Sequence, residues 1–352
     1  MKKILTTLCA VAMLAGCTAG GSKKSSTNTS TKEETAATVM VGTGSVTNVS
    51  NKTKEGSDTA AQFDTTFASV VLEGNVIKYV YFDVAQDKVT YDATGHVTSD
   101  NTASTSKKAL GDKYGMKDKS SIKKEWYEQV EALEKWAVGK TVEEVLNMPT
   151  TQKDEKHTVS ADKDLMTGCT IGVTAFQQAL DKAAKNAVEV KDVASVGSAI
   201  LTQVSGKDAS AEKSGEAKAS STYGVVALDK DGKVVFTQTD EAQNAVKFTT
   251  AGVVDGEAVA IATKGEKKDG YGMKKVSSIG KEWFEQNQAY DDWTVGKTGK
   301  EIADMKVTTN EGGKTVTADK DLMTGCTIGV TAFQQALDKA AKNAVEVKDV
   351  TS

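Results

Sequence analysis

A seven-residue segment with the features of a phosphate site occurs twice in this chain. Residues 164–170 are Asp-Leu-Met-Thr-Gly-Cys-Thr, and residues 321–327 repeat them letter for letter. Each copy continues as Ile-Gly-Val-Thr-Ala-Phe-Gln-Gln-Ala-Leu-Asp-Lys-Ala. Gly168 and Gly172 have no side chain, so main chain can approach a ligand closely there. The last threonine of each copy, Thr170 or Thr327, lies just ahead of a predicted helix.

Three features of the following residues predict that helix. Thr174 and Gln177 have the spacing of a capping box, and Lys182 and Lys185 suit the negative C-terminal end. Apolar residues recur on one face, namely Phe176, Leu180, Ala183 and Ala187. Backbone N–H groups at a helix start attract phosphate, so each last threonine lies where phosphate would be held. The alternative is a capped helix without a ligand.

Both segments resemble the attachment site of the FMN-binding domain family, which is Asp-x-x-Ser/Thr-Gly-Ala-Thr followed by a helix. In that family a flavin transferase moves FMN from FAD onto the last threonine and forms a phosphoester. The resemblance therefore implies two FMN groups, one on Thr170 and one on Thr327. The matching positions in the two copies are Asp164, Thr167, Gly168, Thr170, Asp321, Thr324, Gly325 and Thr327.

The sequence departs from the family pattern at one position in each copy. Cys169 and Cys326 stand where the family usually has alanine. Cysteine is small and often behaves as a buried apolar residue, so we expect both to be tolerated. The other two cysteines are Cys9 and Cys17, and no disulfide framework is expected.

The first 16 residues have the pattern of a lipoprotein signal peptide. Met1-Lys2-Lys3 is a short positive region, and 4–15 is an apolar run too short to span a bilayer. The run ends in Leu-Ala-Gly-Cys, which resembles the lipobox of bacterial lipoproteins and implies cleavage before Cys17 and lipidation of its sulfur. Two acyl chains on Cys17 would hold the protein at the outer face of the membrane.

Residues 17–38 form a predicted tether, because Gly, Ser, Thr, Lys, Asn and Glu dominate and almost nothing is apolar. Such a coil spans roughly 25 Å on average and about 70 Å when straight. The folded part would therefore stay close to the membrane surface.

The rest of the chain is an internal duplication. At a shift of 157 residues, 161–193 recurs unchanged as 318–350, and 125–129 recurs as 282–286 with one change. This pattern predicts two tandem homologous domains of the FMN-binding type, 39–193 and 194–352. Each is long enough to bury about 70% of its unfolded surface in its own core.

Inside each unit, antiparallel strands are expected first and helices later, which is an α+β pattern. Predicted strand pairs are 68–72 with 76–82 and 223–228 with 233–239. Ser121 is expected to cap a helix, and Thr141 and Thr298 are expected to begin capping boxes with Glu144 and Glu301. The low-complexity segments 51–59 and 206–222 are predicted as long exposed loops.

Other residues favour no second kind of site. His96 and His157 lie opposite Val253 and Lys314 in the duplication, so a metal or triad site built on them is not expected. Four aromatic residues could stack on a flavin ring or belong to the cores: Tyr114, Trp126, Tyr271 and Trp283.

Charge argues against nucleic acid as a partner. The formal net charge is −4, and it becomes −6 once Lys2 and Lys3 leave with the signal peptide. Lysines are mixed with acidic residues rather than clustered, and no Walker loop or dinucleotide fingerprint occurs.

The function that we predict is a redox carrier rather than a substrate-specific enzyme. The chain resembles flavinylated lipoproteins of Gram-positive extracellular electron transfer, which implies attachment to the cell membrane on its extracytoplasmic face. That resemblance also implies a membrane NADH dehydrogenase and quinone chain as electron donor, and ferric iron or other extracellular acceptors. The alternatives are a surface lipoprotein with a binding or adhesive role, and a cleaved signal peptide that acts as a peptide pheromone.

Overall fold

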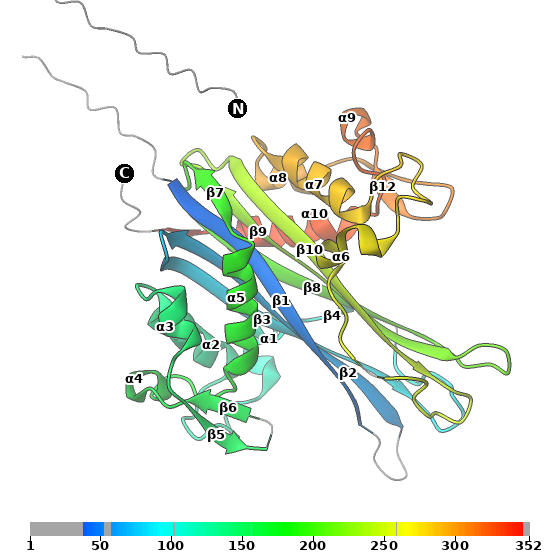
Figure 1. Cartoon of the computed structure of the whole chain (residues 1–352), viewed down its shortest axis with the longest axis horizontal. Helices are drawn as coiled ribbons and strands as arrows, with labels where there is room; N and C mark the ends of the chain where they lie inside the picture. Colours follow the sequence, from blue (N-terminus) through cyan, green and yellow to red (C-terminus); the bar gives the residue numbers. More distant parts are fainter. Residues whose placement is uncertain (1–37, 53–57, 101–102, 156, 258, 348–352) are drawn as a thin grey trace, which may run out of the picture. The chain divides into compact units, whose positions relative to one another are not determined.

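The computed structural model describes residues 38–52, 58–100, 103–155, 157–257 and 259–347. The signal peptide, Cys17 and the tether up to residue 37 lie outside these residues. The described residues form one compact unit. Its elements occur in two series of nearly the same order, 38–191 and 195–346, called here the first and second series (Figure 1).

Each series contributes one antiparallel sheet. The first sheet has the order β3-β2-β1-β7, with strands Thr38–Lys52 (β1), Thr59–Glu73 (β2), Val76–Tyr91 (β3) and Val188–Lys191 (β7). The second has the order β10-β9-β8-β13, with strands Ser195–Lys207 (β8), Gly215–Leu228 (β9), Val234–Phe248 (β10) and Val345–Glu346 (β13). A two-residue strand of the first series, Ala103–Ser104 (β4), pairs with β8.

Helices and short hairpins follow the three long strands in both series. In the first they are Lys107–Leu110 (α1), Gly111–Tyr114 (η1), Trp126–Ala137 (α2), Val142–Leu146 (α3), Thr150–Asp154 (β5), His157–Ser160 (β6), Lys163–Met166 (α4) and Thr174–Lys185 (α5). In the second they are Lys264–Lys267 (α6), Lys268–Tyr271 (η2), Trp283–Thr294 (α7), Gly299–Ala303 (α8), Val307–Thr309 (β11), Thr315–Thr317 (β12), Lys320–Met323 (α9) and Thr331–Lys342 (α10).

Side chains alternate between the two faces of each sheet, and each face has a different neighbour. Gly42 and Gly44 of β1 face α5, which lies along the strand (Figure 1). A Cβ at Gly42 would lie 2.3 Å from the Ala183 carbonyl oxygen, so only glycine allows this approach. Thr43, between them, faces the other way and donates from its N to Gln238 Oε1 at 2.7 Å in the second sheet.

The faces without helices pack against each other, so the two series share an interface. The rings of Phe67 and Tyr223 stack there with centroids 4.8 Å apart, and the hydroxyl oxygens of Ser69 and Ser198 lie 2.6 Å apart. The remaining apolar side chains form separate cores between each sheet and its own helices. The α+β class is therefore confirmed, while the division into domains 39–193 and 194–352 stays a prediction.

The predicted strand pairs are confirmed as parts of β2, β3, β9 and β10, but the predicted loop 206–222 is wrong. Strand β8 runs to Lys207 and β9 begins at Gly215, which leaves seven residues between them. Small residues alternate along β9, with Ala217, Ala219 and Ser221 buried against the first sheet. For 51–59, Asn51 and Thr59 belong to strands, and 53–57 lie outside the described residues.

The capping predictions are right at α3 and α8 and wrong ahead of α2. Thr141 and Thr298 form the predicted capping boxes with Glu144 and Glu301. Ser121 does not cap a helix, because α2 begins at Trp126 with Glu125 as its cap. The Glu125 carboxylate also accepts the N–H groups of Met116 and Lys117, which fixes the turns ahead of α2. Among the described helices, none is long and apolar enough to cross a membrane.

Candidate functional site

The repeated motif folds as a short helix followed by an extended segment. Asp164 lies in the first turn of α4 and is exposed, and Thr167 ends that helix. The Thr167 hydroxyl donates to the Asp164 carbonyl oxygen at 2.8 Å, and Thr324 does the same to Asp321 at 2.7 Å. The hydroxyl of the first threonine in each motif therefore donates its hydrogen bond within its own helix turn.

The last threonine of each motif makes a different contact, with a buried glutamine. Gln129 Oε1 accepts from the Thr170 backbone N at 2.9 Å and from its hydroxyl at 3.2 Å. Gln286 Oε1 accepts from Thr327 in the same way, at 2.9 and 3.0 Å. Both glutamines are fully buried, on α2 and α7, while both threonines are partly exposed. Each threonine residue is thus partly exposed, and its hydroxyl is held by the glutamine.

The glutamine amide is itself fixed in orientation. Gln286 Nε2 donates to Ser277 Oγ at 3.1 Å and to the Lys281 carbonyl oxygen at 3.0 Å. Gln129 Nε2 makes the matching bonds, both at 3.1 Å, to Ser120 and Lys124. Because a carbonyl oxygen can only accept, the amide nitrogen must face Lys281, and Oε1 must face the threonine.

Sequence reasoning missed this glutamine. Gln129 is 41 residues from Thr170, so no local pattern connects them. The signals were its retention in both copies of the repeat and its place beside the apolar residues of α2, where a polar side chain needs a partner.

Gly168 and Gly325 serve the packing of the motif. A Cβ at either position would lie only 2.7 or 2.8 Å from the Cβ of Ala132 on α2 or Ala289 on α7. The nearby ammonium of Lys124 or Lys281 lies 3.8 Å from the same point. Glycine therefore lets each motif approach the helix that carries the glutamine. The lysine ammonium lies close to this point of contact.

Cys169 and Cys326 are buried, as their small size predicts, with 1% and 0% of their surface exposed. Burial raises the pKa of each thiol to about 11. Both are therefore protonated at neutral pH and are not nucleophiles.

The predicted capping box at the start of α5 is wrong. Thr174 is the first helical residue, Val173 is the cap, and no described side chain caps this end. Gln177 instead donates from Nε2 to the carbonyl oxygens of Val145 and Leu146, which ties α5 to the end of α3. Without a side-chain cap, the amides of the first turn are available to an anion.

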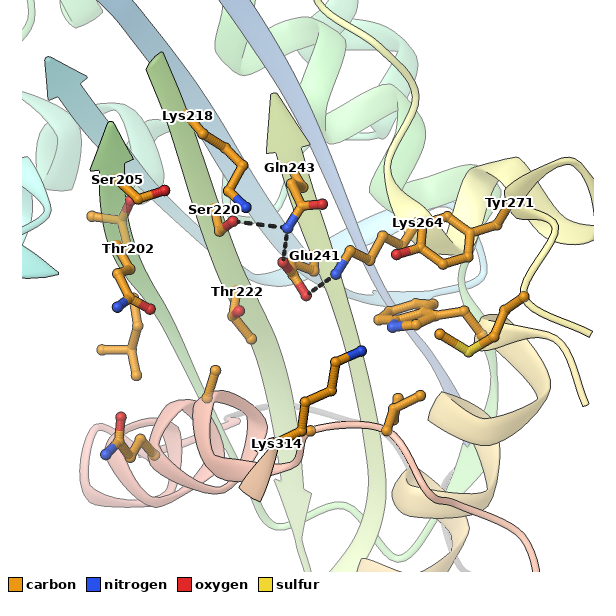
Figure 2. A pocket seen from close by; sticks show the side chains of 18 of the residues that line it. Thr202, Ser205, Lys218, Ser220, Thr222, Glu241, Gln243, Lys264, Tyr271 and Lys314 are labelled. Carbon is orange, nitrogen blue, oxygen red and sulfur yellow. Dashed lines mark hydrogen bonds and ion pairs between the residues drawn. The ribbon is translucent and has the colours of Figure 1, made fainter. Parts of the chain in front are cut away.

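A cavity of about 760 Å³ lies on the helix-bearing face of the second sheet (Figure 2). Ile328 and Gly329, which follow Thr327, line it. Met273 also lines it, and the Met273 sulfur accepts from Gln286 Nε2 at 3.5 Å. Gln286 thus contacts both the Thr327 hydroxyl and a side chain that lines this cavity. The volume lies within the range of small-molecule sites.

The charged residues that line this cavity favour an anionic ligand. Lys264 and Lys314 point into it, and Lys218 lines it as well (Figure 2). Glu241 is the acidic residue among the lining side chains, and its carboxylate pairs with Lys264 at 2.7 Å. The lining therefore carries an excess of positive charge.

Aromatic side chains take two different roles at the site. Trp126 and Trp283 are only 4% and 2% exposed and belong to the cores, and Trp283 also lines the cavity. Tyr271 is partly exposed and lines the cavity, with the Lys264 ammonium 5.8 Å from its ring centre. Tyr114 has a matching neighbour, because the Lys107 ammonium lies 5.3 Å from its ring centre. A lysine and a tyrosine thus recur near both motifs.

The histidines form separate surface pairs, and the His157 ring lies beside Gly172, two residues after Thr170. His96 Nδ1 is 2.8 Å from Asp208 Oδ2, and His157 Nδ1 is 2.7 Å from Asp154 Oδ1. Within the described ranges, no group of three or more His, Cys, Asp or Glu side chains could hold a metal ion.

Comparison with protein-family models, curated proteins and solved structures found no match to this chain.

Proposed function

We propose that this protein is an electron carrier with two FMN groups, joined by phosphoester bonds to Thr170 and Thr327. The observation that carries the proposal is the recurring hydrogen bond between the hydroxyl of a partly exposed threonine and the oxygen of a buried glutamine. A hydroxyl whose hydrogen already points to a fixed acceptor presents its oxygen lone pairs outward, as a phosphoryl acceptor must.

The residues around Thr327 fit an FMN group. The cavity would take the flavin ring, with Tyr271 as an aromatic wall and Lys264 and Lys314 as cations. Lys281 and the uncapped amides of α10 would face the phosphate. When bound, FMN supplies the electron exchange, and the protein contributes position and electrostatic environment. The role is therefore that of a carrier rather than of a substrate-specific enzyme.

The cellular setting is part of the same proposal. Lipidation of Cys17 would keep the protein on the extracytoplasmic face of the cell membrane. There a flavin transferase would attach FMN, a membrane NADH dehydrogenase and quinone chain would supply electrons, and ferric iron or other extracellular acceptors would take them. A covalent bond suits this place, because a dissociable flavin would diffuse away. A short tether would also keep the carrier concentrated near its membrane donor.

Flavin fluorescence in a denaturing gel tests the proposal. Protein made with a flavin transferase and FAD should be yellow and should keep flavin fluorescence after denaturing electrophoresis, because a phosphoester survives unfolding. Protein made without the transferase is the control. A colourless protein from the complete reaction would remove the carrier function and favour a surface-binding role.

The anchor is tested by Cys17→Ser. We expect the variant to leave the membrane fraction with its flavin content unchanged, because sequence 17–38 separates the anchor from both motifs. The measurement is flavin per polypeptide in membrane and soluble fractions. A folded soluble variant without flavin would show instead that attachment requires the membrane.

A further inference from the structure

A largely buried ion pair of the first series involves a lysine that the second series lacks. Lys108 Nζ of α1 lies 2.7 and 2.8 Å from the two carboxylate oxygens of Glu134 on α2. The two side chains are only 15% and 14% exposed. The same ammonium lies 4.0 Å from the centre of the Tyr81 ring. The Glu134 carboxylate is thus paired with the Lys108 ammonium.

At the shift of 157 residues, Asp291 takes the place of Glu134, and Gly265 takes the place of Lys108. The backbone around the two positions is alike. The Phe82 N–H donates to Glu134 Oε1 at 2.7 Å, and the Thr239 N–H donates to Asp291 Oδ2 at 3.0 Å.

The backbone N–H at the position of the missing lysine also keeps its hydrogen bond to an aspartate. The Lys108 N–H donates to Asp83 Oδ1 at 3.0 Å, and the Gly265 N–H donates to Asp240 Oδ1 at 2.8 Å. The second series therefore keeps the carboxylate and the frame of the ion pair but not its ammonium.

A cavity of about 290 Å³ lies at this place, and both Gly265 and Asp291 line it. Its volume is several times the roughly 30 Å³ that one water occupies in the liquid. Asp291 is 4% exposed, and three donors reach it: the Thr239 N–H, the Thr239 hydroxyl at 2.9 Å and the Thr237 hydroxyl at 3.4 Å. Because a carboxylate has about four acceptor sites, one remains for a further donor.

No cation in the surroundings replaces Lys108 among the interactions of the described residues. Lys268 lines the cavity, but its ammonium lies 4.7 Å from the centre of the Phe284 ring. Glu266 also lines it and is paired with Lys182 of α5 at 2.6 Å. The other charged groups near Asp291 are Asp240 of β10 and Asp292 of α7, and both are acidic.

We propose that this cavity binds a small primary alkylammonium ion, whose charged group takes the position beside Asp291 that Lys108 takes beside Glu134. The ion would donate to the remaining acceptor site of Asp291, and its carbon chain would lie in the cavity that Gly265 and Asp291 line. The bound charge would compensate a buried carboxylate, which is costly to leave without a cation. This proposal does not depend on the flavin.

The test measures the binding of n-butylammonium to the flavin-free protein. Saturation-transfer NMR detects the binding directly, and the melting temperature reports its effect on stability. At constant ionic strength, we expect a saturable NMR signal and a saturable rise in Tm, because a ligand of the folded state stabilises it. 1-Butanol has a similar shape without the charge and should give neither effect. Sodium chloride at the same concentration should not reproduce the rise.

The pH dependence provides a second readout. Burial raises the pKa of Asp291 to about 7, so its carboxylate is mostly neutral at pH 6 and mostly ionised at pH 8. An alkylammonium keeps its charge over this range. The apparent dissociation constant should therefore be about tenfold larger at pH 6 than at pH 8.

Two variants decide the outcome. Asp291→Asn should lose both the binding and its pH dependence, while Glu134→Gln, in the site that Lys108 already fills, should keep them. Binding that persists in Asp291→Asn, or an equal effect of butanol or sodium chloride, would overturn the proposal. Absence of any saturable signal from the wild-type protein would mean that water fills the cavity, which also overturns it.

Discussion

Replacing Thr327 with valine should remove one FMN group and leave the other in place. Valine has nearly the shape of threonine but lacks the oxygen that would carry the phosphoester. Thr170→Val should likewise lose one group, and the double variant should lose both. The two losses should add, because each threonine contacts its own glutamine on its own helix. Intact mass of each purified variant, after reaction with the transferase and FAD, gives the count.

The neighbouring threonines are the matched controls. Thr167 and Thr324 use their hydroxyls within their own helix turns, so Thr167→Val and Thr324→Val should still carry two FMN groups. They could load more slowly if the transferase recognises the motif there. Peptide mapping that placed flavin on Thr167 or Thr324 would refute the assignment, as would two flavins on the variant without Thr170 and Thr327.

Gln286→Leu should slow the loading of Thr327 by about 100-fold while Thr170 loads at its normal rate. The Gln286 oxygen fixes the direction of the Thr327 hydroxyl, and a misplacement of about 1 Å at a reacting group can cost about that factor. The effect should appear in kcat more than in KM, because the exposed surface of the motif is unchanged. Time courses of flavin incorporation, resolved by peptide mass, measure both sites in one sample.

The first site is the internal control for this variant, because Gln129 still holds Thr170. Leucine also removes the amide from the partly buried Ser277 hydroxyl and Lys281 carbonyl, at a cost of about 0.5–1.5 kcal/mol for each lost hydrogen bond. The melting temperature of Gln286→Leu should therefore be measured together with its loading rates, so that a loss of stability is distinguished from a loss of positioning. Equal loading of both threonines in a folded Gln286→Leu protein would show that the glutamine has no positioning role.

Local patterns in the sequence predicted the parts of the fold that local physics determines. The capping boxes at Thr141 and Thr298 depend on a hydroxyl and a carboxylate three residues apart, and the structure has both. The strand pairs predicted next to turns containing Gly74 and Gly232 are present as well. Each of these predictions required only neighbours in the chain.

Contacts between distant residues were beyond such patterns. Ser, Lys and Ala in 206–222 suggested a loop, but the small residues Ala217, Ala219 and Ser221 alternate on the buried face of β9. The helix prediction at Thr174 was right, whereas its capping box failed because Gln177 is occupied by the end of α3. The contact between Gln129 and Thr170 joins residues 41 positions apart, so only the structure shows it.

Divergence between the two copies also became interpretable only with the structure. The change from Lys108 to Gly265 is a single difference among many in an alignment of the two copies. In the fold, it removes the cation from a buried carboxylate and coincides with a cavity. The identical motifs therefore lie in series whose surroundings are not equivalent.

The intact mass of the wild-type protein tests the central claim most directly. After reaction with a flavin transferase and FAD, denatured protein should have the mass of the polypeptide plus two FMN groups less two waters, and digestion should place the flavins on peptides that contain Thr170 and Thr327. A mass equal to that of the bare polypeptide, from a folded protein under conditions in which the transferase modifies a known substrate, would contradict the account.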